Sequence, residues 1–208
     1  MKKNVSIPDK HSERLYPVVL ELLTANDFYK VDVRTISKTS GVSIGTIYKY
    51  FKSKEDLLFS ILEEKIHEID QLIRTHIQGL KSFKEIFRKM LWVTMDYYDR
   101  NPGLAVTAFI TVPIRTWMKE ASYRMLPTTF DKALNSAIES GQVDAIIDRR
   151  RFQDIYYMIC YRCIHTWYYF GMKWTLVEAI EKDYEMFWKM LAPPTNPLSG
   201  NSNTTRIK

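Results

Sequence analysis

The sequence predicts an all-α protein, and three observations support this fold class. Only 7 glycines and 8 prolines occur among 208 residues, so the turn residues that separate short strands are scarce. Hydrophobic residues make up 46% of the chain, enough for a substantial core. Apolar residues recur at helical spacing along most of the chain, between breaks rich in glycine, proline, asparagine and serine. We expect helices packed into one large domain, or into a small domain joined to a mid-sized one.

The first helical stretch reads SERLYPVVLELLTANDF, with its leucines and valines at helical spacing. Pro17 interrupts this stretch, because proline removes one hydrogen bond of a helix and clashes with the preceding turn. Two alternatives follow. Either the regular helix begins near Tyr16, with Pro17 in its first turn, or the helix bends at Pro17.

Two short helices are predicted next, on either side of a glycine. Asp32 is a good N-cap for a helix through Lys38. Gly41 follows at a position suited to a left-handed C-cap. Ser43 can then cap a second helix with the sequence IGTIYKY. Two short helices around a tight turn form a helix-turn-helix, which places its second helix in the major groove of DNA.

Longer helices are predicted in the rest of the chain. Ser53 and Asp56 resemble a capping box that opens a long amphipathic helix. Further helical stretches are expected at 82–100, 102–110, about 116–140, 149–171 and 176–191, with Asp148 capping the fourth of them. The first of these is apolar over more than one face, so we expect it to run through the centre of its domain. Residues 193–208 are rich in Pro, Ser, Asn and Thr, and we expect them to be disordered.

Positive charge is concentrated around the predicted helix-turn-helix. The net charge is +6, and residues 29–54 alone carry six basic residues and one acidic residue. A local basic patch indicates a polyanionic partner, most commonly nucleic acid. The alternative is a solvated face that only aids solubility.

The second short helix carries residue types suited to DNA recognition, in which phosphate contacts supply affinity and base contacts supply specificity. Gly45 allows the backbone to approach the duplex closely. The candidates for contacts with base edges are Ser43, Ile44, Thr46 and Lys49. The candidates for phosphate contacts are the hydroxyls of Tyr48 and Tyr50 and the first-turn cation Lys54. The alternative is that the two tyrosines are core aromatics.

The stretch ISKTSGVSIGTIYKYFKSKEDLL closely resembles the TetR (tetracycline-repressor-like) family of bacterial regulators. Members of that family read I-A, then A-G-V-S, then G-T-x-Y-x-Y-F, then K-E-x-L, and the resemblance covers about residues 13–62. Departures are Ser37 and Ser40 in place of alanine, Asp27 in place of glycine, and Pro17 within the first helix. None of these departures lies in the second short helix.

The resemblance implies a homodimer with an N-terminal three-helix DNA-binding domain over residues 1–56. A larger helical ligand-binding and dimerisation domain would follow over 57–192, and then the tail 193–208. It implies a transcriptional regulator, most simply a repressor, whose two heads bind a pseudo-palindromic operator and which a small ligand releases. Carried over residue by residue, the phosphate contacts are Arg34, Tyr48, Tyr50 and Lys54, and the base contacts are Ser43, Ile44, Thr46 and Lys49.

The C-terminal region is rich in aromatic and methionine side chains, which suit a mostly apolar ligand pocket. We expect a large hydrophobic or aromatic effector, acidic if Arg115, Arg124 or Arg162 points inward. The candidate lining residues are Met90, Thr94, Tyr97, Phe109, Trp117, Tyr161 and His165. Each of them could instead be an ordinary core or surface residue.

The last two predicted helices, 149–171 and 176–191, are expected to form a four-helix bundle across a dimer axis. The first of them is apolar nearly all round, as a helix with both a core face and a partner face would be. The alternative is a fully buried core helix within one subunit.

Several other functions find no support in the sequence. We expect no enzyme, catalytic residue, cofactor or metal, because no nucleophile–base pattern, phosphate loop or ligand set is present. Cys160 and Cys163 form a C-x-x-C, better explained as two buried thiols than as a redox or zinc pair. No apolar run could span a membrane and no secretory signal is recognisable, so we expect a cytoplasmic protein. A small-molecule carrier with a vestigial helix-turn-helix remains the alternative function.

Overall fold

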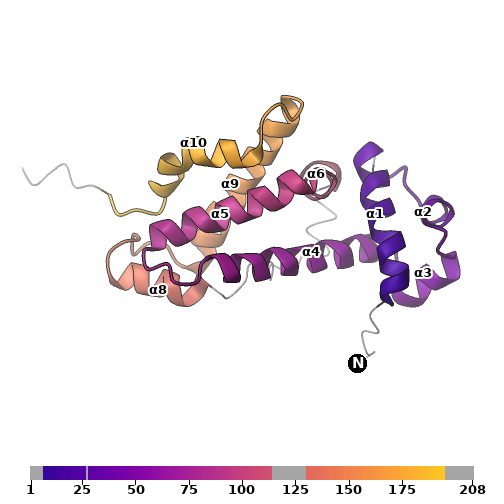
Figure 1. Cartoon of the computed structure of the whole chain (residues 1–208), viewed down its shortest axis with the longest axis horizontal. Helices are drawn as coiled ribbons and strands as arrows, with labels where there is room; N and C mark the ends of the chain where they lie inside the picture. The colour runs from indigo at the N-terminus through magenta and orange to yellow at the C-terminus, as the bar shows by residue number, and fades with distance from the viewer. Residues whose placement is uncertain (1–6, 27, 114–129, 195–208) are drawn as a thin grey trace, which may run out of the picture.

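The computed structural model describes residues 7–26, 28–113 and 130–194. Every regular element in these ranges is a helix (Figure 1), which confirms the predicted all-α fold class. None of the helices in the described ranges is long and apolar enough to cross a membrane. Residues 195–208 of the predicted tail, and the predicted helix 116–140 before Phe130, lie outside the described residues.

The first three helices form a compact head at one end of the molecule (Figure 1). They are α1 (Asp9–Ala25), α2 (Val33–Ser40) and α3 (Ile44–Tyr50). Their shared core consists of fully or almost fully buried side chains, among them Leu15, Val19, Leu23, Ile36, Val42 and Ile47. Apolar residues at helical spacing on three short helices thus meet in one small core.

Helix α1 begins at Asp9 and continues through Pro17, so of the two alternatives the start near Tyr16 was wrong. Proline has no N–H to offer the carbonyl of Glu13, four residues earlier. Glu13 and Pro17 are both exposed, so water can take the place of the missing donor. The helix tolerates proline here because the missing hydrogen bond faces solvent.

A long helix, α4 (Lys54–His76), leads from the head into the larger part of the molecule (Figure 1). Helix α5 (Phe83–Arg100) lies against it and also packs against α6, α8, α9 and α10. This confirms the prediction that the stretch 82–100 runs through the centre of its domain. We call the part of the molecule from α5 to α10 the regulatory region, after the ligand-binding role that is expected for it from the sequence.

The regulatory region continues with α6 (Pro102–Val106), the π-helical turn η1 (Thr107–Thr111), α8 (Asp131–Glu139), α9 (Arg149–Tyr169) and α10 (Leu176–Trp188). Asp148 caps α9 as predicted, accepting a hydrogen bond from the Arg151 N–H at 2.8 Å. Thr175 and Glu178 form a capping box at the start of α10, which was not predicted from the sequence. The predicted helix 102–110 exists but widens from α to π geometry at Thr107, a feature often found at functional sites.

The head meets the regulatory region where α1 contacts α6 and η1. The Thr24 hydroxyl lies 2.7 Å from the Leu20 carbonyl, 3.1 Å from the Gly103 carbonyl and 3.3 Å from the Thr107 hydroxyl. Thr107 is completely buried. One hydroxyl group therefore links the end of α1 to the junction of α6 and η1.

Candidate nucleic-acid interface and effector region

The turn between α2 and α3 is built from local hydrogen bonds. Asp32 caps α2 by accepting the Thr35 N–H at 2.7 Å, and this hydrogen bond lowers the pKa of the Asp32 carboxyl. Gly41 ends the helix with φ of 66°, where its N–H donates to the Ser37 carbonyl at 2.9 Å. This left-handed backbone conformation favours glycine, because glycine lacks the Cβ that would clash with the backbone. Both caps confirm their predictions.

Helix α3 has one face in the core of the head and the other in solvent. Ser43 caps the helix as predicted, accepting the Thr46 N–H at 3.1 Å. Ile47 and the following Phe51 are buried and hold the helix against the head. On the opposite side Tyr48 is 54% exposed, which excludes for this tyrosine the alternative of a core aromatic within one chain. The exposed face is free to meet a partner.

Most of the residues predicted to contact DNA are exposed or half-buried on α2, α3 and the turn between them. The exposed members are Arg34, Ser43, Ile44, Gly45, Tyr48 and Lys49, whereas Thr46 and Tyr50 are half-buried. A Cβ built on Gly45 would meet only the Ser43 hydroxyl oxygen, at 4.0 Å, so the backbone is open there. The Lys49 ammonium lies 5.5 Å from the centre of the Tyr50 ring. Small side chains, a bare backbone and the cation Lys49 are thus exposed along α3 and its N-cap.

Unlike the other residues predicted to contact DNA, Lys54 directs its side chain toward the protein. Its ammonium donates to the carbonyls of Phe28, at 2.6 Å, and Val31, at 2.9 Å. The same ammonium lies 4.1 Å from the centre of the Phe28 ring, within the range of a cation–π interaction. The Lys54 side chain therefore points into the head, toward the loop between α1 and α2.

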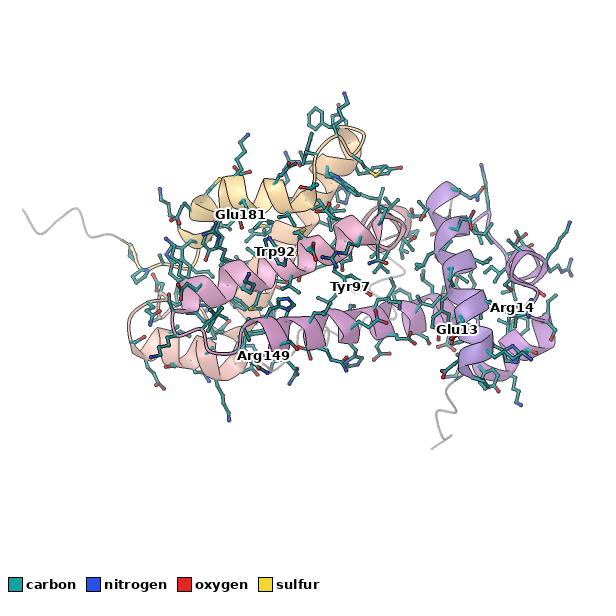
Figure 2. The ribbon with its side chains drawn as sticks, in the orientation of Figure 1. Glu13, Arg14, Trp92, Tyr97, Arg149 and Glu181 are labelled. Atoms are coloured by element: carbon teal, nitrogen blue, oxygen red, sulfur yellow. The ribbon has the colours of Figure 1, made fainter. Side chains whose placement is uncertain are left out.

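Arg14 is a cation of this region that was not predicted from the sequence. It projects from α1 toward α2 and α3 (Figure 2). One of its guanidinium nitrogens lies where a Cβ on Gly41 would need room, so the arginine covers the bare glycine of the turn. The contact joins residues far apart in the chain, and no local pattern predicts it. Arg14 adds an exposed positive charge next to the helix-turn-helix.

The predicted effector residues fall into three groups. Met90 and Thr94 are buried residues of α5, and the Thr94 hydroxyl and the Tyr156 hydroxyl of α9 hydrogen-bond to each other at 2.5 Å. Tyr97 lies between α5 and α4 (Figure 2) and donates its hydroxyl proton to Glu68. Burial and this hydrogen bond raise the pKa of Tyr97.

The third group brings Phe109, Tyr161 and His165 together at the contact between η1 and α9. The His165 ring stacks on Tyr161, with centroids 3.9 Å apart, and its Nε2 lies 2.7 Å from the Phe109 carbonyl oxygen. Tyr157 completes the row, since its ring lies 5.8 Å from Phe109 and 6.1 Å from Tyr161. Trp117, Arg115 and Arg124 lie outside the described residues, and Arg162 is exposed on α9.

An open cleft of about 420 Å³ lies at the seam between the head and the regulatory region. Its lining residues are Thr24, Ala25, Asn26, Phe28, Tyr29, Thr111, Pro113 and Tyr168. None of them was a predicted effector residue. The cleft shows that the end of η1 and the end of α9 both border the head.

The two cysteines are buried on α9 and are not bonded to each other. Burial raises the pKa of both thiols, that of Cys163 to about 11. Both therefore stay protonated and weakly nucleophilic near neutral pH. In the part of the chain that the structure describes, no three His, Cys, Asp or Glu side chains gather as a metal site would require.

Comparison with known proteins agrees with this geometry. The sequence profile of the family described as "Bacterial regulatory proteins, tetR family" matches residues 19–61, which span part of α1, all of α2 and α3, and the start of α4. The fatty acid metabolism regulator protein of Bacillus subtilis (strain 168) is 26% identical over 181 residues, covering 83% of this chain and 91% of that protein. The HTH-type transcriptional regulator HbdR of Aromatoleum sp. (strain CIB) is 22% identical over 197 residues, covering 88% and 82%.

Solved structures show the same fold. The transcriptional regulator FadR from Bacillus subtilis, in complex with stearoyl-CoA, superposes with a TM-score of 0.74 at 22% identity, covering 84% of this chain and 96% of that one. The fatty acid degradation regulator FadR from Bacillus halodurans gives a TM-score of 0.71 at 17% identity, covering 88% and 96%. Profile, relatives and fold agree with the head described above: residues 19–61 match the tetR family, and over most of its length the chain resembles proteins described as transcriptional regulators.

Proposed function

We propose that the protein is a repressor that binds a pseudo-palindromic operator as a homodimer and is released by a small hydrophobic effector. The observation that carries DNA recognition is the solvent face of α3, where Ser43, Lys49 and their neighbours are exposed beside a capped and rigid turn. A helix of this kind fits the major groove, where base edges are read. Arg34, Tyr48 and Tyr50 are proposed as phosphate contacts, and Ser43, Ile44, Thr46 and Lys49 as base contacts.

The proposed dimer uses α9 and α10. Within one chain these helices leave large apolar side chains in solvent, including Met158 at 48% exposed and Met186 at 59%. A second copy would cover them by the same surface, as two-fold symmetry requires. We expect Met186→Glu to lower the dimer fraction in analytical ultracentrifugation and to weaken operator binding. A wild-type chain that stays monomeric at all concentrations would contradict this part of the proposal.

For the effector we propose a long-chain fatty acyl thioester. The support comes from relatives, one described as a fatty acid metabolism regulator and one solved with stearoyl-CoA. In this chain the row formed by Phe109, Tyr157, Tyr161 and His165 is the best candidate for the effector contact, because it joins α9 to η1. Movement of η1 would reach the head through Thr107 and Thr24.

The experiment is a titration of a labelled duplex from upstream of the protein's own gene. We expect the protein to bind this duplex and stearoyl-CoA to release it, whereas free coenzyme A does not. The Tyr161→Ala variant should need more stearoyl-CoA for release, with unchanged affinity for DNA. DNA binding that no acyl-CoA of any chain length weakens would refute the effector and leave the DNA-binding assignment standing.

A further inference from the structure

We propose that Lys54 is a positioning residue for DNA binding, which fastens the loop between α1 and α2 to the start of α4 instead of contacting a phosphate. The geometry of its ammonium carries this inference. Two of its three N–H donors are directed at the carbonyls of Phe28 and Val31, at 2.6 and 2.9 Å, and the Phe28 ring lies beside it at 4.1 Å.

The loop needs the donors that Lys54 supplies. Phe28 is 2% exposed and Val31 is 3% exposed, so water has little access to these two residues, although Tyr29 between them is 72% exposed. A buried carbonyl without a donor is costly, because it has given up its water partners without replacement. Lys54 is the first residue of α4, so these two hydrogen bonds tie that helix to residues 23 and 26 positions earlier in the chain.

The loop in turn sets where α2 begins. Val31 directly precedes Asp32, the N-cap of α2, and Arg34 follows in the first turn. A displaced loop would therefore move the cap and the exposed arginine together. It would also loosen the joint between the head and α4. Lys54 can thus influence DNA affinity without touching DNA.

The surroundings of the α4 N-terminus also disfavour a phosphate. Glu55 and Asp56 place two carboxylates in the first turn of the helix. Asp56 accepts the Lys52 N–H at 2.7 Å, and the Asp56 N–H donates to the Ser53 hydroxyl oxygen at 3.1 Å. The Asp56 N–H, one of the backbone donors that a phosphate could use, is therefore already engaged, and the two carboxylates would repel a phosphate at this helix end.

The test compares Lys54→Met with Arg34→Met, which removes an exposed cation of the head. Binding is measured on two fluorescein-labelled duplexes, one from upstream of the protein's own gene and one of random sequence, over a range of salt concentrations. We expect Lys54→Met to weaken binding by roughly tenfold at every salt concentration, so that the slope of log Kobs against log salt is unchanged. Arg34→Met should lower the magnitude of that slope by about 0.9 for each phosphate that the Arg34 guanidinium neutralises.

Two readouts do not need DNA. Lys54→Met should lower the Tm and speed hydrogen exchange of the α2 amides, whereas Arg34→Met should do neither. Phe28→Leu removes the ring beside the ammonium but no charge, and it should shift Tm and DNA affinity in the same direction as Lys54→Met. A Lys54→Met chain that fails to fold supports the positioning role, because a surface phosphate contact is dispensable for folding.

The proposal is overturned if Lys54→Met lowers the salt slope as Arg34→Met does while its Tm and α2 exchange match wild type. It is also overturned if Phe28→Leu leaves both Tm and affinity unchanged. A wild-type protein with flat salt dependence would count against the phosphate contacts proposed for the head, and the exchange of α2 would still decide the role of Lys54.

Discussion

The head and the regulatory region differ in how far apart the residues that shape them lie in the chain. In the head, the Asp32 side chain accepts a hydrogen bond from the Thr35 N–H, and the Ser43 side chain accepts one from the Thr46 N–H. Each of these helix caps joins residues three positions apart. In the regulatory region, the Thr94–Tyr156 hydrogen bond spans 62 residues and the His165–Phe109 contact spans 56. Short-range chemistry fixes the surface proposed to meet DNA, whereas long-range packing fixes the region proposed to bind the effector.

The largest effect is expected in the long-range core. Phe152 is fully buried, and its ring lies 4.9 Å from Phe130 and 5.7 Å from both Phe83 and Phe87. Phe152→Ala should lower the free energy of unfolding by about 3–5 kcal/mol, because the cavity cannot fully collapse. All five tryptophans lie beyond the head, so their fluorescence during denaturation reports on the regulatory region.

The matched control for that change is Tyr169→Ala. Tyr169 lies on the same helix, α9, but is 81% exposed. It should alter the free energy of unfolding by less than about 0.5 kcal/mol. Equal decreases from the two variants would show that the aromatic cluster around Phe152 does not stabilise the region.

The next effect separates backbone strain from the function of the turn. Gly41 and Gly79 both have positive φ, 66° and 81°, so alanine at either position should cost about 1–2 kcal/mol. At Gly79 a Cβ meets nothing within 4 Å, whereas at Gly41 it displaces Arg14. We expect similar decreases in thermal stability from both variants, but weaker DNA binding only from Gly41→Ala. Equal DNA affinities would refute a role for the Arg14 contact in DNA binding.

Caps offer a smaller test in the two regions. Ser43→Ala in the head and Thr175→Ala at the start of α10 should each cost about 1 kcal/mol, since each removes an acceptor for a backbone N–H. Urea denaturation measures both effects. Only the Ser43 variant should also weaken DNA binding. If Thr175→Ala weakened it equally, the division between head and regulatory region would fail.

The smallest expected effect is on the reactivity of the two buried cysteines, which should hardly react with an alkylating reagent near neutral pH. The pKa of Cys163 is raised to about 11 and that of Cys160 is raised as well, so at pH 8 roughly one Cys163 in a thousand is a thiolate. Iodoacetamide should therefore label the native protein far more slowly than free cysteine. Labelling should speed up as pH rises toward 11, and both thiols should react after unfolding. Rapid labelling of either cysteine at pH 8 would revive a redox role.

The difference between short-range and long-range contacts also explains which features could be predicted from the sequence. Caps at Asp32, Ser43 and Asp148 and the C-cap at Gly41 follow from residue types a few positions apart, so they were found. The contact between Arg14 and Gly41 joins separate helices, and no periodic pattern contains it. The inward direction of the Lys54 side chain was not predicted for the same reason, because it depends on carbonyls 23 and 26 positions earlier in the chain.

The effector candidates show this limit most clearly. Met90, Tyr97 and His165 share a hydrophobic or aromatic character that any helical core also shows. Only packing separates the buried Met90 from Tyr97, which faces Glu68, and from His165, which stacks on Tyr161. Composition can suggest a pocket, but it cannot say which side chains meet.

The most direct test of the central claim is the salt dependence of DNA binding by the wild-type protein and by Lys49→Ala. The claim is that exposed cations around α3 meet phosphates and base edges. We predict that log Kobs for the duplex from upstream of the gene falls linearly and steeply from about 50 to 200 mM salt, because each phosphate contact releases counterions. Lys49→Ala should change which operator bases matter, with mismatch costs of about 1–3 kcal/mol. Binding that is absent, or flat across this range, would contradict the claim.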